Sequence, residues 1–224
     1  EFALWYRAYR GLSVEVTVVP MAQWDPHSRP WPQGRPWIEP SPNLPTMESL
    51  RPYPGTVMVE GTRLSEGRGT TKPLMMVGHP EIDAGKVIAR MRSLAPNWTE
   101  GAALRSRYFE PVFHKHAGAL CSAVEIVATP PFYDPSRFAP YRLVSLLLKT
   151  IHLLYPELPL WSAPPYEYER ERLPFDVING GPRLRHWIED EAESLESVET
   201  ALRRDEIEWE NSRRPFLLYG DQNV

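Results

Sequence analysis

The chain has 224 residues, of which 42% are hydrophobic and 11% aromatic, a composition typical of a globular protein with one sizeable domain or two small ones. Its net charge of −4, from 25 basic and 29 acidic residues, offers no electrostatic basis for binding nucleic acid or an anionic membrane surface. The densest apolar run, Leu143–Leu148, is interrupted by Ser145 and is too short to span a bilayer, so we expect no membrane insertion.

The first residues, Glu1–Arg10, have the apolar spacing of an amphipathic helix that ends at Gly11. They carry no initiator Met and no signal-peptide pattern, so we expect the chain to be a fragment or a processed piece of a longer protein. The alternating, β-branched segment Val14–Pro20 predicts a strand.

Residues 22–55 form a Pro/Trp-rich segment in a chain whose 25 prolines are about twice the average share. Proline breaks regular structure, and Trp24, Trp31 and Trp37 are too apolar for a solvated tether. The segment therefore predicts a long ordered loop that contributes to a cleft. Near its end, Thr46 can cap a short helix.

A strand–loop–strand unit follows. Thr56–Glu60 is short, β-branched and half apolar, which predicts a strand. The Gly-rich loop 61–73 comes next and is expected to be a second cleft element, because glycine permits sharp backbone turns. Leu74–Val77 predicts another short strand, and Asp83–Leu94 has the apolar spacing of a helix.

The second half of the chain continues the mixture of strands and helices. Tyr108–Phe113 and Ala119–Ala128 predict strands, and Ser136 can cap a buried helix over 137–155. Two polar, amphipathic helices are predicted further on, over Arg183–Ala192 and Ser197–Asn211.

Strands and helices alternate irregularly and no internal repeat is found, which favours an α+β fold with a mixed sheet, packed helices and long Pro/Trp-rich loops. We expect residues 1–224 to form a single domain of this class. The one cysteine, Cys121, rules out an internal disulfide, and its apolar surroundings predict a buried structural thiol rather than a nucleophile.

The Gly-rich loop carries the main candidate site. Glu60 and Glu66 can act as general acid and base or nucleophile, since glycoside hydrolysis needs such a carboxylate pair. Arg68 can keep one of them ionised or bind an anionic substrate group. The alternative is structural: Glu66 and Arg68 form an ion pair that holds the turn, and Glu60 caps backbone amides. The sequence leaves both open.

A phosphate-binding loop is a competing interpretation of Ser65–Thr71, but the segment lacks both the P-loop and the dinucleotide-binding patterns, so no cofactor is expected. Ser41 and Asn43 lie between closely spaced prolines in a rigid extended turn. The Asn43 amide can offer a donor and an acceptor to a sugar, or it can bond to its own backbone in an Asx-type turn.

Histidines offer a third candidate cluster. His114 and His116 share a face if the preceding strand extends that far, and two such rings can ligate a metal. No third ligand is apparent in the local sequence, so hydrogen-bonded structural histidines are expected and no metal site is predicted. His79, just beyond the Gly-rich loop, can reach the same cleft.

Four motifs follow one another in a distinctive order. They are Trp37-Ile38-Glu39-Pro40-Ser41-Pro42-Asn43-Leu44-Pro45-Thr46, Tyr53-Pro54-Gly55, Glu60-Gly61-Thr62 and Ser65-Glu66-Gly67-Arg68-Gly69-Thr70-Thr71-Lys72-Pro73. In this order they resemble the NamZ-type exo-β-N-acetylmuramidase family, and weaker similarity extends over nearly the whole chain.

The resemblance implies that the chain is the C-terminal part of a two-domain glycosidase whose Rossmann-like N-terminal half is absent here. It implies removal of terminal N-acetylmuramic acid from peptidoglycan fragments, an active cleft between the halves, a catalytic carboxylate from the other half, and an extracytoplasmic location. The partners implied are a peptidoglycan-derived sugar and that N-terminal half. Carried over by position, the residues that match the strongest motifs are Ser41, Asn43, Glu60, Glu66, Arg68 and Thr70.

Some positions depart from the family pattern. Leu74 replaces a usual Phe, and His79 and Glu81 replace the usual Ala and Trp around Pro80. These changes lie beside the Gly-rich loop, so they bear on the cleft wall and on sugar preference.

Two hypotheses follow. In the first, the protein is a glycosidase with Glu66 and Glu60 as catalytic candidates, and Arg68, Asn43, Ser41, Thr70 and His79 as substrate-binding candidates. In the second, this chain alone is a non-catalytic, carbohydrate-binding half that completes the cleft of a separate catalytic half.

Overall fold

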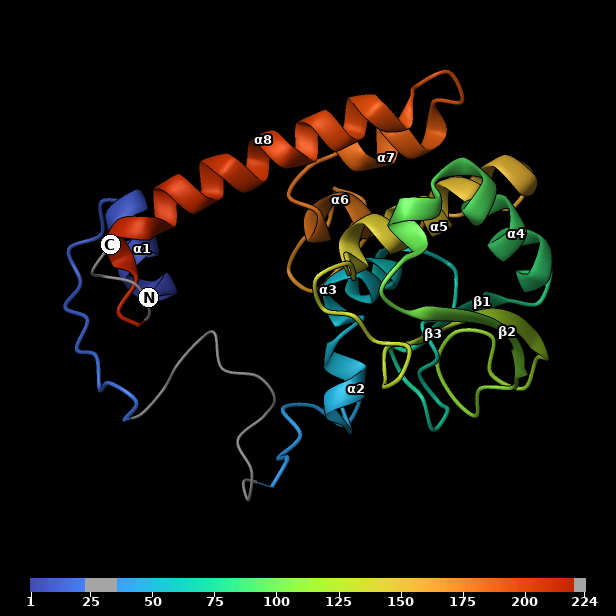
Figure 1. Ribbon diagram of the computed structural model, residues 1–224, viewed down its shortest axis with the longest axis horizontal. Helices are drawn as coiled ribbons and strands as arrows, with labels where there is room; N and C mark the ends of the chain where they lie inside the picture. The colour runs from blue at the N-terminus through green and yellow to red at the C-terminus, as the bar shows by residue number, and fades with distance from the viewer. Residues whose placement is uncertain (23–35, 220–224) are drawn as a thin grey trace. The chain divides into compact units, whose positions relative to one another are not determined.

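The computed structural model describes residues 1–22 and 36–219 (Figure 1). They form two compact units, one from Glu1–Pro36 with Ser194–Val224 and the other from Trp37–Glu193. The assignment of residues 1–224 to one domain of a larger protein stays a prediction. Trp24 and Trp31 of the Pro/Trp-rich segment lie outside the described residues.

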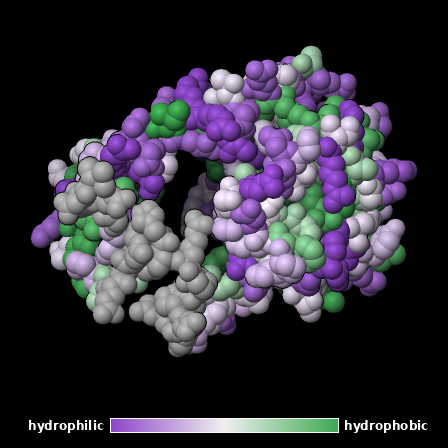
Figure 2. Space-filling view, in the orientation of Figure 1, coloured by the Kyte–Doolittle hydropathy of each residue, from purple (hydrophilic) through white to green (hydrophobic). Residues whose placement is uncertain are grey.

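The first unit is helical. Helix α1 (Phe2–Tyr9) packs on α8 (Leu195–Arg213), where the Trp5 indole donates to Ser212 Oγ at 2.7 Å. The short helix η3 (Arg214–Phe216) follows α8 directly. Figure 2 shows that most of the α8 surface facing the viewer is hydrophilic, as the polar periodicity of that segment predicts.

The strand predicted over Val14–Pro20 is wrong, because these residues have no regular structure. A β-branched segment becomes a strand only where a neighbouring strand accepts and donates its backbone hydrogen bonds. The helix at the N-terminus is confirmed, and Gly11 ends it with a φ of 59°.

The second unit contains a three-stranded sheet of order β1-β3-β2. Its strands are β1 (Met76–His79), β2 (Ala103–Phe109) and β3 (Cys121–Val127), and both pairs are antiparallel. The α+β class is confirmed; the sheet, expected to be mixed, is antiparallel throughout the described residues. The predicted strand Tyr108–Phe113 starts earlier and ends at Phe109.

Helices cover one face of this sheet, and loops cover the other (Figure 1). Helix α4 (Ala84–Leu94) contacts β2, β3 and helix α5 (Pro140–Leu154). Asp83 caps α4, with its Oδ1 accepting from the Lys86 amide at 3.1 Å, and the helix predicted over Asp83–Leu94 is confirmed. The other helices of this unit are α2 (Met47–Leu50), α3 (Tyr53–Thr56), η1 (Val57–Gly61), η2 (Pro96–Thr99), α6 (Pro174–Ile178) and α7 (Arg183–Glu189).

Helix α5 forms the centre of the core, with nine consecutive buried residues from Leu143 to Ile151. Its N-cap is Ala139, so the predicted cap at Ser136 is wrong. Ser136 instead donates its hydroxyl to Asp134 Oδ1 at 2.6 Å, which satisfies the serine within a local turn before the helix. Among residues 1–22 and 36–219, no helix combines the length and apolarity that crossing a bilayer requires.

Side chains alternate across the sheet and make two apolar layers. The layer that faces α4 includes Val77, Val124 and Ile126, all with no exposed surface. On the opposite face, a smaller buried cluster lies under the loops, consisting of Met76, Phe109, Cys121 and Ala123. Burial raises the pKa of the Cys121 thiol, and the prediction of a buried structural cysteine is confirmed.

The strand predicted over Thr56–Glu60 is also wrong, since these residues end α3 and form η1. The reason is tertiary. Gly55 packs directly on α5, where an added Cβ would lie 2.1 Å from the Pro140 carbonyl oxygen. Thr56 Oγ1 then donates to Leu74 O at 2.9 Å, which anchors the helical turn beside the start of β1. Close packing of α3 on α5 and of η1 on α6 outweighs the β propensity of the segment.

Candidate functional site

The Gly-rich loop 61–73 is held between β1 and the loop that joins β2 to β3. Ser65 and Gly78 exchange two backbone hydrogen bonds at 2.8 and 2.9 Å, which fixes the loop to the edge of β1. Gly69 has a φ of 79°, and an added Cβ there would lie 2.5 Å from the Phe113 carbonyl oxygen. Glycine is therefore required at this position both for backbone angle and for space.

Glu66 lies at the centre of the site and its side chain has no exposed surface. Its Oε1 accepts from Arg68 Nε at 2.8 Å, and its Oε2 accepts from Lys115 Nζ at 2.9 Å. His114 Nδ1 lies 3.5 Å from Oε1. A buried carboxylate is stable only when it is paired in this way, so Glu66 holds the loop to the segment that contains Lys115.

Glu60 differs from Glu66 in its exposure, since 21% of its side chain is accessible. Arg68 Nη2 donates to Glu60 Oε1, and the Tyr166 hydroxyl donates to Glu60 Oε2 at 3.1 Å. One guanidinium thus bridges two carboxylates, one exposed and one buried. The ion pair of Glu66 and Arg68, which was the structural alternative to a catalytic role, is therefore present, and it also includes Glu60.

Lys115 and Tyr166 complete the cluster, and neither was singled out as a site residue from the sequence. Lys115 Nζ also donates to Val59 O at 2.9 Å. Burial lowers the pKa of Lys115, although the negative charge of Glu66 acts in the opposite direction. Burial, with the adjacent charge of Glu60, raises the pKa of Tyr166 to about 12. Lys115 had a weak signal, its place between two histidines, whereas Tyr166 lies in a Pro-rich segment with no local motif.

The charges within this cluster balance. Glu60 and Glu66 carry two negative charges, and Arg68 and Lys115 carry two positive ones. The predicted catalytic and anion-binding residues are therefore brought together, but Arg68 is already engaged by both carboxylates. Their individual roles in chemistry stay predictions.

The histidines form a separate pair beside the site. His79, on β1, meets His116 in an edge-to-face contact with ring centroids 4.4 Å apart. Burial lowers the pKa of His79, and the neighbouring His116 adds to this effect. His114 and His116 lie in a loop with φ values of 72° and 59°, so the strand does not extend to them. The structure describes no group of three or more metal-ligating side chains in residues 1–22 and 36–219.

The other predicted sugar-binding residues make local turn bonds. Ser41 Oγ accepts from the Asn43 amide at 3.3 Å, and Ser41 O accepts from the Leu44 amide at 2.8 Å. Thr70 Oγ1 donates to Gly67 O at 2.6 Å and accepts from the Lys72 amide at 3.0 Å. These bonds shape the two predicted cleft segments, and direct contact of the side chains with a sugar stays a prediction.

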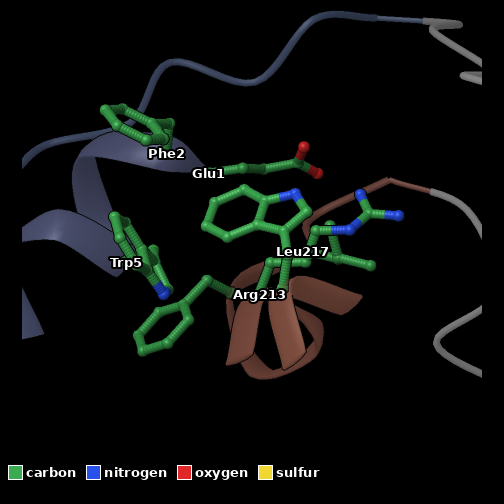
Figure 3. A pocket seen from close by; sticks show the side chains of 7 residues that line it. Glu1, Phe2, Trp5, Arg213 and Leu217 are labelled. Carbon is green, nitrogen blue, oxygen red and sulfur yellow. The ribbon is translucent and has the colours of Figure 1, made fainter. Parts of the chain in front are cut away.

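A small pocket lies within the helical unit, at the junction of α1, α8 and η3. Figure 3 shows Phe2 and Trp5 on one side of this pocket and Arg213 and Leu217 on the other. Its volume is about 120 Å³, well below the 300–1,000 Å³ of common ligand sites. The Trp5 and Trp209 rings pack edge to face at 4.8 Å, which favours a packing role for these aromatics.

Comparison with models of protein families assigns the chain to a family. A family model described as the C-terminal part of the exo-β-N-acetylmuramidase NamZ matches residues 51–219, and the model of the N-terminal part matches residues 1–48. The chain belongs to the NamZ family of glycoside hydrolases. The resemblance found in the sequence is confirmed, with the addition that the first residues match the N-terminal model.

One relative supports this assignment, and two solved structures share the fold. The peptidoglycan β-N-acetylmuramidase NamZ of Bacillus subtilis (strain 168) is 32% identical over 219 residues, which cover 98% of this chain and 49% of that protein. Two crystal structures of DUF1343 family proteins from Bacteroides fragilis NCTC 9343 share the fold, with TM-scores of 0.78 and 0.66 at 19% and 24% identity. These matches cover 98% and 99% of this chain and 55% of each solved chain. The chain therefore spans about half the length of the proteins it matches.

Proposed function

We propose that this chain is part of a glycosidase that releases terminal N-acetylmuramic acid from peptidoglycan fragments, outside the cytoplasm. Family membership supports the reaction class, and the name of the Bacillus subtilis relative supports the substrate. The observation that carries the proposal is the carboxylate pair Glu60 and Glu66, joined by the guanidinium of Arg68.

In this proposal the two carboxylates have different tasks. Glu60 is partly exposed and can approach a sugar ring, where a carboxylate can act as nucleophile, as base or as a stabiliser of an oxocarbenium-like transition state. Glu66 is buried, so it positions Arg68 and Lys115 rather than meeting the sugar. The second catalytic carboxyl then comes from the rest of the protein. We further propose that the turn with Ser41 and Asn43 lines the sugar site, as do Thr70 and His79.

The test is hydrolysis of a chromogenic N-acetylmuramide by the full-length protein. We expect Glu60→Gln to lower kcat by roughly 100-fold or more, because it removes the charge at the accessible carboxylate. Glu157→Gln is a matched control, since Glu157 is an exposed glutamate that is not part of the cluster. No release by the wild-type protein, with an active muramidase as positive control, would refute the reaction. Undiminished turnover by Glu60→Gln would remove Glu60 from the chemistry.

The burial of Glu66 favours a second candidate function, in which this chain alone binds carbohydrate without hydrolysing it. Both Glu66 oxygens are paired with cations, so of this pair only Glu60 is accessible. Titration of the isolated 224-residue chain with N-acetylmuramic acid distinguishes the two. Binding without turnover supports the auxiliary function, and turnover by the isolated chain supports a complete active site.

A further inference from the structure

A second charged cluster lies on the loop-covered face of the sheet. Arg105 and Glu125 are paired across β2 and β3, and Arg107 follows two residues later on the same face. Lys72, from the end of the Gly-rich loop, reaches the same carboxylate, with its Nζ 2.5 Å from Glu125 Oε1. Arg107 Nε lies 2.8 Å and Arg105 Nε 3.6 Å from Glu125 Oε2.

This cluster has an excess of positive charge. Among the described residues, Glu125 is the carboxylate with which all three cations pair. Its side chain is 1% exposed, whereas those of Lys72, Arg105 and Arg107 are 35%, 53% and 44% exposed. Three positive charges therefore surround one buried negative charge, and the uncompensated cations face solvent.

The first cluster, around Glu66, has no such excess because its two cations are matched by two carboxylates. An anionic group of a ligand is repelled there by Glu60 and competes with it for Arg68. At the Glu125 cluster, the same group meets two guanidinium groups beside a buried carboxylate, Arg107 hydrogen-bonded to it and Arg105 at 3.6 Å. Guanidinium groups are well suited to carboxylates because their planar donors match the two oxygens.

The Gly-rich loop contributes residues to both clusters. Glu66 and Lys72 lie six residues apart, and the chain between them folds back, so that an added Cβ at Gly67 would lie 2.9 Å from Lys72 O. Thr70 Oγ1 accepts from the Lys72 amide at 3.0 Å, which stabilises this turn. The Gly-rich loop thus carries both Arg68, which pairs with Glu60, and Lys72, which belongs to the cluster with excess positive charge.

We propose that Lys72, Arg105 and Arg107 form a binding site for a carboxylate of the muramic acid substrate. This inference rests on the proposed function, and it moves the anion-binding role from Arg68 to the Glu125 cluster. The carboxylate can come from the lactyl group of the sugar or from a peptide attached to it, and the ligands used in the test separate these sources.

The test compares ligands that differ in this group, by calorimetric titration of the full-length protein. N-acetylglucosamine has the same ring without the lactyl carboxylate, and N-acetylmuramyl-L-alanyl-D-isoglutamine carries its carboxylate on the peptide. We expect N-acetylmuramic acid to bind at least about tenfold more tightly than N-acetylglucosamine if the lactyl group is bound. A preference shown only by the muramyl peptide assigns the site to the peptide carboxylate.

The decisive variant is Arg105→Gln, because Arg105 makes the longest contact with Glu125 and leaves the closer Lys72 and Arg107 pairs intact. We expect it to reduce the preference for the carboxylate ligand several-fold, with N-acetylglucosamine binding unchanged. Arg105→Gln/Arg107→Gln should abolish the preference, with folding checked by circular dichroism. Arg90→Gln is the matched control, since Arg90 is exposed on α4, which covers the opposite face of the sheet.

Several results would overturn the inference. These are equal binding of all three ligands by the wild-type protein, an unchanged preference in Arg105→Gln, or a preference lost in Arg68→Gln alone. Hydrolysis is measured on the same preparations, so that a failure of the binding inference can be distinguished from a failure of the proposed glycosidase function. A wild-type protein that prefers the carboxylate ligand but releases no sugar supports the binding site and refutes the glycosidase.

Discussion

The ammonium group of Lys115 lies 2.9 Å from Oε2 of Glu66, although 49 residues separate them in the chain. This contact joins the Gly-rich loop to the segment between β2 and β3, and it pairs a carboxylate with no exposed surface with an ammonium group whose side chain is 18% exposed. The buried carboxylate depends on this cation, because without it part of its charge would remain in the interior without compensation.

Replacing Lys115 tests this dependence. Lys115→Met leaves the buried Glu66 with one cation fewer, and we expect the free energy of unfolding to fall by about 3–5 kcal/mol. Lys86→Met is the control, because the Lys86 side chain is 75% exposed and its pair with Asp83 spans 3.8 Å. Equilibrium urea denaturation measures both. Equal stabilities of the two variants would contradict a structural role for the Lys115 contact.

Gly69 and Gly118 separate two effects of adding a methyl group. Both have positive φ, 79° and 74°, but an added Cβ meets the Phe113 carbonyl at Gly69 and nothing within 4 Å at Gly118. We expect Gly118→Ala to cost about 1–2 kcal/mol from backbone strain alone, and Gly69→Ala to cost clearly more. Thermal unfolding of the two variants measures this difference. A similar loss of stability in both would mean that the Gly-rich loop can move away from the Phe113 carbonyl without a large energetic cost.

The Tyr166 hydroxyl is predicted to remain protonated well above the usual range. Burial and then Glu60 raise its pKa to about 12, so the folded state holds this proton between about pH 10 and 12. Stability from this group is therefore lost as pH rises through that window.

Ultraviolet absorbance of tyrosinate measures this directly. At about pH 11, rapid measurement should show equal tyrosinate absorbance in the wild-type protein and in Tyr166→Phe. At about pH 13 the wild-type protein should exceed the variant by one tyrosine. A full difference already present at the lower pH would mean that Tyr166 ionises normally.

Acid should weaken the Glu125 cluster. Burial opposes ionisation of Glu125, but the hydrogen bonds and charges of Lys72 and Arg107 together outweigh it and lower the pKa of this carboxyl. Because the folded-state pKa is below the ordinary value, the stabilisation is present above about pH 4.5 and is lost as pH falls through the lower, folded-state value.

Denaturation of the wild-type protein and of Glu125→Gln at several pH values tests this expectation. The stability advantage of the wild-type protein should be constant near neutral pH and shrink below about pH 4.5. Glu157→Gln, at an exposed site, should keep a constant offset from the wild-type protein over the same range. An advantage for Glu125 that persists at low pH would contradict the lowered pKa.

Local patterns in the sequence were sufficient for part of this structure. The apolar spacing of α4 and α8 follows from helical periodicity, which depends only on neighbours three and four residues apart. Glu60, Glu66 and Arg68 could be grouped before the fold was known because they lie within nine residues of one another.

Tertiary packing decided the rest. The segment from Thr56 to Glu60 has the composition of a strand but is helical, since α3 packs on α5 and η1 packs on α6 rather than beside another strand. Lys115 and Tyr166 reach the site from distant loops, and no periodicity connects residues 49 and 106 positions apart.

The sequence by itself therefore determined the family, the α+β class and the residues that carry charge in the Gly-rich loop. Only the tertiary structure decided which charges are buried, which are balanced and which are exposed. Burial and charge balance depend on contacts between distant segments, so Glu66 is enclosed while Arg105 and Arg107 remain exposed around Glu125.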